Sequence, residues 1–185
     1  MKKSNLILLC ALGMAIFFTL VFQLTVHSNV RKGKSNEVAV KTISESRDIP
    51  YFEKIVVKNR IKVIFRQNDT SSVLVEAPNY IIDSISTTLI NNELVLSVSK
   101  KLKKKDSILI QIDNPILTSV KLSNNAHFDT AGKVSGKELH LELKDASSGN
   151  LSLDYENMEY INNTEGSIAI QGEIKKIALT SNTEQ

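Results

Sequence analysis

The sequence predicts an all-β protein, a short right-handed β-helix-like solenoid preceded by a single N-terminal transmembrane helix. Three observations lead to this prediction. The chain of 185 residues opens with one long apolar segment. The remainder consists of short runs in which apolar and polar residues alternate, as they do in half-buried strands. From residue 117 onward these runs recur about every 20 residues, an interval that suits one solenoid coil per repeat.

The apolar segment at residues 6–26 contains no charged residue. As an α-helix it would be about 31 Å long, close to the roughly 30 Å thickness of a bilayer core. A cleaved signal peptide has a shorter apolar stretch and a small-x-small site, which the residues after Val26 lack. Cys10 has no small residues before it, so lipoprotein processing is not favoured. We therefore expect an uncleaved anchor, with cleavage as the alternative.

The basic residues on the two sides of the anchor nearly balance, so the positive-inside rule does not decide its orientation. The expected organisation is a cytoplasmic N-terminus at residues 1–5, the anchor or signal at 6–26, a polar linker at 27–46 and one folded domain at 47–185. The length of the chain suits one hydrophobic core.

Short strands are expected in the first half of the domain. β-branched residues dominate five runs, which Asn, Asp, Ser or Pro separate, at residues 54–57, 61–65, 72–76, 94–98 and 108–112. Asn91 and Asn92 predict a tight hairpin, because Asn tolerates positive φ. Within the domain, a helical turn or a bend is expected only at residues 78–83.

The second half of the domain contains a repeat. Residues 122–128, 143–151 and 161–168 each have an apolar residue, a small or polar turn and a second apolar residue, and a fourth copy begins at Leu179. Stacked coils would bury the apolar stripe that a single coil leaves exposed. A β-sandwich with irregular hairpins is the competing architecture.

This repeat defines two sets of residues. Those expected to point inward are Val120, Leu122, Phe128, Leu139, Leu141, Leu143, Leu151, Leu153, Ile161, Ile168, Ile170, Ile174, Ile177 and Leu179. Those expected at polar corners are Asn124, Asn125, Asp145, Asn162 and Asn163.

The strands and turns together resemble the head GIN domain family of putative auto-transporter adhesins, common in Bacteroidetes-type bacteria. The resemblance rests on RDIPYFEKIVV at residues 47–57, IKVIFRQND at 61–69 and SVLVEA at 72–77, and it continues to the C-terminus. The family favours Gly in its turns, where this chain has mostly Asn or Asp, which also adopt left-handed conformations. The resemblance implies a β-helix-like fold, export, and an adhesive or surface role without a defined ligand.

Composition excludes several classes of function. Of the 23 Lys and Arg residues, Lys2 and Lys3 precede the apolar segment, which leaves 21 basic against 20 acidic side chains. A nucleic-acid-binding domain would carry a clear basic excess, so we expect no nucleic-acid partner. Cys10 is the sole cysteine, so the domain has no disulfide, thiolate metal site or thiol nucleophile.

No motif indicates catalysis, and we expect no catalytic, cofactor-binding or metal-binding residues and no cofactor. We place His127 in a turn and His140 on the outer face of a strand, and interpret both as surface residues. Glu138, His140 and Glu142 alternate onto one side of a strand, where a weak cation or sugar site competes with a solvated face. The other carboxylates considered are Asp145, Asp154 and Glu156.

A basic cluster precedes the run at 108–112. It consists of Lys100, Lys101, Lys103, Lys104 and Lys105. Contact with anionic lipid or acidic glycans is one interpretation. The alternative, which we favour, is an exposed edge that lysines protect against aggregation.

The function expected is that of a non-enzymatic adhesin-like binding module, anchored by residues 6–26 in a single pass and facing the periplasm or the cell surface. A glycan or an envelope protein is the expected partner, besides the membrane. The alternatives are a structural or sensory protein–protein interaction domain of the cell envelope and, from a third class, a glycan-active enzyme.

Overall fold

The structure is a computed structural model that describes residues 13–14, 16–23, 40–162 and 165–180. The chain divides into two compact units, residues 1–40 and 41–185. In the first unit, residues 13–14 and 16–23 are helical. No helix within the described residues is both long and apolar enough to cross a membrane. The rest of the anchor predicted at residues 6–26 lies outside the described residues.

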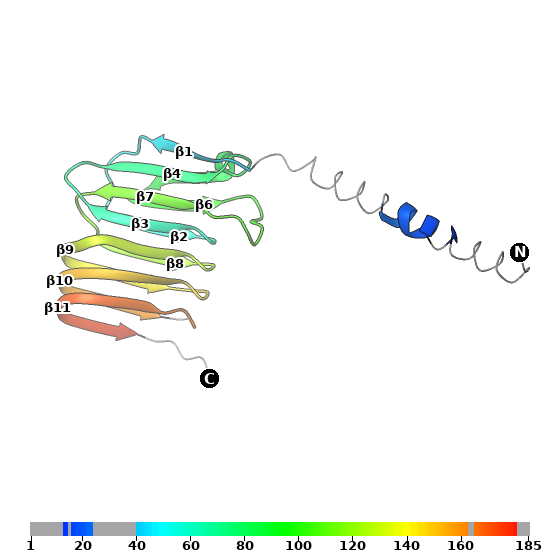
Figure 1. The fold of residues 1–185 in the computed structure, drawn as a ribbon. Helices are drawn as coiled ribbons and strands as arrows, with labels where there is room; N and C mark the ends of the chain where they lie inside the picture. Colours follow the sequence, from blue (N-terminus) through cyan, green and yellow to red (C-terminus); the bar gives the residue numbers. More distant parts are fainter. Residues whose placement is uncertain (1–12, 15, 24–39, 163–164, 181–185) are drawn as a thin grey trace, which may run out of the picture. The chain divides into compact units, whose positions relative to one another are not determined.

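The second unit is mostly β and forms one 11-stranded, strongly curled mixed sheet (Figure 1). In chain order its elements are β1 (Thr42–Arg47), β2 (Lys54–Lys58), β3 (Lys62–Gln67), β4 (Ser72–Pro78), the 3₁₀ helix η1 (Ile82–Ser84), β5 (Ile85–Ile90), β6 (Glu93–Val98), β7 (Leu109–Asn114), β8 (Ser119–Ser123), β9 (His127–Leu143), β10 (Ser148–Asn162) and β11 (Ile168–Thr180).

The five strands and the hairpin expected in the first half are confirmed, and η1 overlaps the expected helical turn. One difference concerns the boundary of the domain. β1 begins at Thr42, inside the range assigned to the polar linker, and pairs antiparallel with β4 from Thr42↔Pro78 to Arg47↔Val73. Its sequence TISESR has little apolar alternation, because β1 is an edge strand with most residues exposed.

β9 is the strand that curls the sheet. Its residues 127–130 pair in parallel with β3, and its residues 140–143 pair in parallel with β8. The first part therefore joins the layer β1–β4–β7–β3, and the second part joins the layer β8–β2–β6–β5. The two layers face each other across the hydrophobic core.

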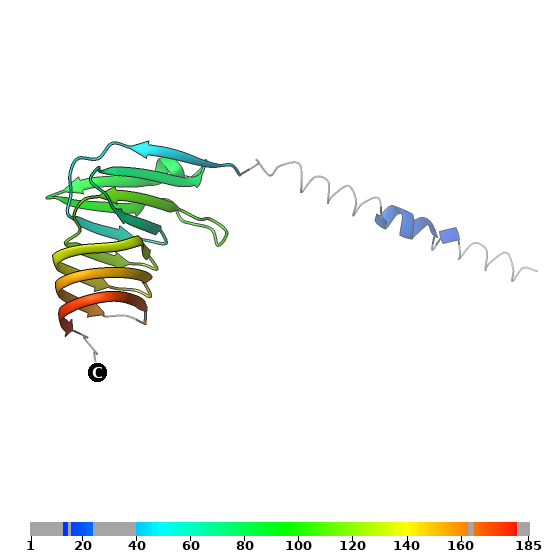
Figure 2. The same ribbon diagram turned by 60° about the vertical axis from the view of Figure 1, so that its left-hand side comes forward.

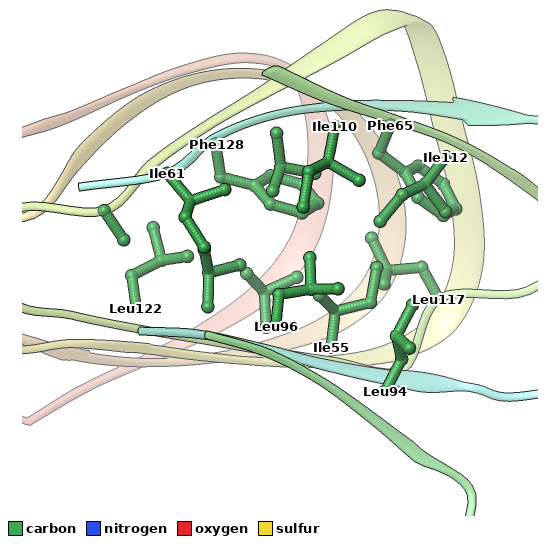
Figure 3. Packing of buried hydrophobic residues seen from close by; sticks show 14 of the residues in the cluster. Ile55, Ile61, Phe65, Leu94, Leu96, Ile110, Ile112, Leu117, Leu122 and Phe128 are labelled. Carbon is green, nitrogen blue, oxygen red and sulfur yellow. The ribbon is translucent and has the colours of Figure 1, made fainter. Parts of the chain in front are cut away.

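The core lies between these layers and is closed by side chains from both (Figure 3). Phe65 and Phe128 stack with ring centroids 6.2 Å apart on one side. Ile55 and Leu96 face them from the other layer (Figure 3). Alternation decides which residues enter this core, since successive residues of a strand point to opposite faces.

Parallel pairing continues from β9 through β10 to β11, which lie stacked along their whole lengths (Figure 2). The register aligns Phe128, Gly149 and Ile168, and it aligns Leu139 with Met158 and Ile177. The expected stacking of the repeat is confirmed, and the competing prediction of irregular hairpins is wrong for this region. The ladder between β9 and β10 shifts register near Gly132, and both ladders are interrupted at Glu156.

Left-handed residues form the corners between strands. Asn124 and Asn125 separate β8 from β9, with φ of 56° and 63°, and Asp145 and Ala146 separate β9 from β10, with φ of 54° and 52°. Stacked corners are linked, since the Asn125 N–H donates to the Asp145 carbonyl at 2.9 Å. The corner role expected for the first two Asn residues and for Asp145 is confirmed. Asn162 instead ends β10, and Asn163 lies outside the described residues.

The inward positions are buried down to β10 but not in β11. The buried members of the set are Val120, Leu122, Phe128, Leu139, Leu141, Leu143, Leu151 and Leu153. Ile168, Ile170 and Ile174 are half-buried. The inward direction predicted for Ile161 is wrong, because Ile161 pairs with Glu142, which lies on the outer face of β9 between the buried Leu141 and Leu143. The prediction of burial is wrong for Ile177 and Leu179, which are 50% and 74% exposed. Their strand is paired with β10 alone among the described elements, so no further rung covers them.

Candidate surface groove

One row of side chains crosses the outer face of the second layer. Parallel pairing places Glu93 of β6 beside Lys54 of β2, Lys54 beside Ser119 of β8, Ser119 beside His140 of β9, and His140 beside Glu159 of β10. Ser119 is buried beneath its longer neighbours. A small side chain between long ones leaves a hollow in the middle of the row.

This hollow is a groove of about 640 Å³, within the size range of small-ligand sites. Polar side chains dominate its walls. The lining residues are Glu53, Lys54, Glu93, Thr118, Ser119, Lys121, Glu138, Leu139, His140, Asn157 and Glu159. Carboxylates outnumber amino groups among them, so the groove suits a hydroxyl-rich or amine-bearing ligand better than an apolar or anionic one.

His140 stands at the centre of the groove with one nitrogen fixed. Its Nδ1 is hydrogen-bonded to Glu159 Oε2 at 2.8 Å, while its Nε2 lies 4.0 Å from Glu142 Oε2. The prediction that His140 faces outward is confirmed, because Leu139 and Leu141 on either side are buried. The hydrogen bond to Glu159 orients the ring, which leaves Nε2 directed away from that carboxylate.

Two ion pairs border the groove. Lys121 Nζ lies 3.8 Å from Glu93 Oε2, and Lys144 Nζ lies 2.8 Å from Glu142 Oε1. The hydrogen bond from Lys144 lowers the pKa of Glu142 against the opposing effect of burial. The lowered pKa favours the ionised form of Glu142, whose carboxylate is paired with Lys144. Of the alternating trio predicted from sequence, Glu138 and His140 line the groove, whereas Glu142 is not a lining residue and is in register with Lys121, which is one.

The second histidine of the domain, His127, lies near the opposite layer. His127 begins β9 instead of lying in a turn, since parallel pairing with Lys62 extends the strand to it. Its Nε2 lies 2.9 Å from Asp129 Oδ1, and its Nδ1 is 2.8 Å from Ser148 Oγ. Asp129 also pairs with Lys62 Nζ at 2.9 Å. This is a self-satisfied surface network, and His127 is half-buried.

The lysine cluster belongs to the connection between β6 and β7, and its anchor is Tyr80. Lys100 Nζ and Lys103 Nζ each lie 5.4 Å from the centre of the Tyr80 ring. The Tyr80 hydroxyl donates to Asp106, which also accepts the Lys103 N–H at 2.7 Å. The hydrogen bond from Tyr80 lowers the pKa of Asp106. At least part of the cluster therefore holds this loop against the domain.

The remaining carboxylates considered from sequence are dispersed. Asp154 lies 3.7 Å from Lys133 and Glu156 lies 3.6 Å from Lys175, both at exposed positions. Asp145 is a corner residue. Among the described residues no group of three or more His, Cys, Asp or Glu side chains could hold a metal ion.

Sequence reasoning missed half of the groove. Glu53, which precedes β2, Lys54 of β2 and Glu93 of β6 are all far from His140 in the chain, and parallel pairing through β2 and β8 brings them to it. No local pattern marks that pairing. The usable signal was limited to alternation within residues 138–142.

Comparison with known protein families identifies the family to which this chain belongs. The sequence matches the family described as "Putative auto-transporter adhesin, head GIN domain" over residues 51–184. The chain belongs to the head GIN domain family. The resemblance noted in the sequence is therefore confirmed, although no curated protein matches this chain.

Solved structures share the fold of this head GIN domain. A putative adhesin from Bacteroides fragilis has a TM-score of 0.70 at 20% identity, covering 76% of this chain and 67% of that one. A putative adhesin from Parabacteroides distasonis has a TM-score of 0.63 at 17% identity, covering 77% and 71%. A putative lipid binding protein from the same species has a TM-score of 0.56 at 12% identity, covering 76% and 72%.

Proposed function

We propose that this head GIN domain is a non-enzymatic, adhesin-like binding module that recognises a glycan in the groove around His140. The observation that carries the proposal is the row of hydrogen-bonding side chains held by consecutive parallel strands, with Ser119 as its buried floor. Strands fix such side chains at regular spacing, so the groove is pre-organised for a ligand rich in hydroxyl groups. The family and the solved relatives named as putative adhesins support an adhesive role.

The proposal extends to where the domain acts. The apolar segment at residues 6–26 would anchor it in a membrane by a single pass, with the domain in the periplasm or at the cell surface. In this setting the rungs from β9 to β11 would act as a short right-handed β-helix-like solenoid, a stiff support for the groove. Protease accessibility in intact cells and spheroplasts, combined with membrane fractionation, tests anchoring and sidedness together.

A glycan array tests ligand binding by the groove. The wild-type chain should bind a reproducible set of neutral or amino sugars, and Glu159→Gln should weaken binding by about tenfold, the effect of losing one charge-assisted hydrogen bond of about 1.4 kcal/mol. Glu156→Gln is the matched control, because Glu156 is an exposed glutamate of the same strand that lies outside the groove. A blank array, or equal effects of the two substitutions, would contradict the proposal.

The same ligands test the non-enzymatic part. Incubation of the chain with each bound glycan should release no new reducing ends. Turnover that disappears in Glu138→Gln or Glu142→Gln would instead support the glycan-active enzyme considered from sequence.

A second function, protein–protein interaction in the cell envelope, is favoured by the exposed apolar side chains of β11. An envelope protein that co-purifies stably with the chain, together with a blank glycan array, would support it over glycan binding.

A further inference from the structure

The end of the stack at β11 has an unusual surface for an edge strand. Among the described residues β11 pairs with β10 alone, so one side of its 13-residue backbone is open to a further strand. Its side chains continue the core, since Ile170 is in register with Leu151, Ile174 with Tyr155 and Ile177 with Met158. Those three β10 residues are all buried.

The opposite end of the sheet differs. The outermost strand there, β1, reads TISESR, and polar side chains predominate along its exposed edge. Edge strands of this kind resist pairing with other chains. β11 has no proline, and its charged residues, Glu173, Lys175 and Lys176, are confined to its middle. The third edge strand, β5, reads ISTTLI, and Arg47 of β1 donates hydrogen bonds to its Ile85 carbonyl and Thr87 hydroxyl. Among the described edge strands β11 is the longest, and it has two exposed large apolar side chains where β5 has one.

From this contrast we infer that two copies of the chain associate end to end through β11, about a two-fold axis between Glu173 and Ile174. An interface of this symmetry requires a surface complementary to itself. The β11 sequence meets that requirement for its apolar residues. With antiparallel pairing about this axis, Ile168 lies opposite Leu179 of the second copy and Ile170 opposite Ile177 of the second copy. All four positions belong to the inward set, so the two cores become continuous.

The irregular middle of β11 meets the same requirement. Gly172 has φ of 114°, and the ladder with β10 skips Lys175. The proposed axis places Gly172 of each copy opposite Lys175 of the other. The irregular middle segments of the two copies therefore face each other, and residues 168–171 of each copy pair with residues 176–179 of the other. A register shifted by one residue would lose this match and place Ile170 opposite the outward Ala178.

Charge is also complementary across the axis. Glu173 lies diagonal to Lys176 of the second copy, a separation of about 7–8 Å that long side chains span in an antiparallel sheet. The pair occurs twice by symmetry. The charged middle of β11 thus favours a second copy of this chain over an unrelated strand.

Engineered disulfides test the register. In a Cys10→Ser background, Ala169→Cys combined with Ala178→Cys places cysteines opposite each other across the axis, both at exposed positions. Within one chain these positions lie on opposite sides of the core, beyond the roughly 7 Å Cα separation that a disulfide allows. Mild oxidation of the full-length chain in detergent should give a covalent dimer on non-reducing gels.

The matched control pairs Ala169→Cys with Gln171→Cys, because Gln171 is also exposed but lies seven residues away from Ala178, the residue opposite Ala169. This control should yield at least about tenfold less dimer. Without cysteines, Leu179→Lys should lower the mass measured by light scattering from dimer to monomer while circular dichroism stays unchanged, since Leu179 is 74% exposed. Three results would overturn the inference. The two cysteine pairs could cross-link equally, the wild-type chain could be monomeric at micromolar concentration, or a different protein could be cross-linked at β11 in membranes. Glycan binding by the groove is measured separately and can fail or succeed independently.

Discussion

Replacing Ala146 by glycine should stabilise the domain. Ala146 has φ of 52°, a left-handed conformation that disfavours residues with a Cβ by about 1–2 kcal/mol. Glycine removes that strain but gives the unfolded chain more freedom, which costs about 0.5–1 kcal/mol. The Ala146 methyl group is exposed, so its loss removes no packing. The net gain should be about 0.5–1 kcal/mol, or roughly 2–4 °C in Tm.

Urea denaturation of the chain from Lys41 onward, followed by circular dichroism, measures this difference. The midpoint should rise while the slope stays constant, because the folded surface does not change. Ala126→Gly is the control. Ala126 is fully buried and absent from the positive-φ residues, so the same substitution there should destabilise by about 1 kcal/mol. If Ala146→Gly is neutral or destabilising while the control behaves as expected, the strain assigned to this corner is wrong.

Three further perturbations probe the stack and its loops. Gly136→Ala should destabilise by about 1–3 kcal/mol in thermal unfolding, because a Cβ there would lie 2.5 Å from Cε1 of the buried Tyr155 ring; an unchanged Tm would show that the ring has room to move. Tyr155→Phe should lower the free energy of unfolding by about 1–2 kcal/mol, because the Tyr155 hydroxyl donates to the Leu117 carbonyl at 2.7 Å and burial raises its pKa, so it stays protonated. A loss of stability no greater than that caused by Tyr51→Phe, at an exposed position, would contradict this role. Asp106→Asn should lower stability at neutral pH, and its difference from wild type should shrink as the pH falls below about 4. The reason is that folding lowers the pKa of Asp106 from 3.8, so the stabilising effect of its carboxylate is lost on protonation. Urea titrations at several pH values measure this difference, and a difference independent of pH would refute the role of the ionised carboxylate.

Much of the fold could be predicted because its signals are local. Alternation located β2, β3, β4, β6 and β7, and Asn91 and Asn92 marked the hairpin, where their φ values are 50° and 62°. The repeat predicted the stacked rungs because an apolar residue before and after each corner must return to the same core. These features need no knowledge of partners distant in the chain.

The rest depended on long-range pairing. β1 has too few apolar residues to be distinguished from a linker, and its strand character comes from the open edge of β4. Alternation indicated that Ile177 and Leu179 point inward, as their register shows, but not that β11 would lack a neighbour. The groove was predicted only in its β9 part, because Glu93 and Lys54 reach His140 through three successive parallel pairings.

The interleaving of the two halves of the chain constrains how the domain can form. β2 lies between β6 and β8, and β3 lies between β7 and β9. Val57 therefore gains its partner Leu122, and Phe65 its partner Thr130, only after about 65 further residues have been made. During synthesis from the N-terminus, β2 therefore lacks its second neighbour until β8 has been made, and β3 lacks its second neighbour until β9 has been made. Contacts of such high sequence separation slow folding and leave apolar edges exposed meanwhile. Shielding of these unpaired strands while the chain is incomplete is therefore expected to raise the yield of folded domain.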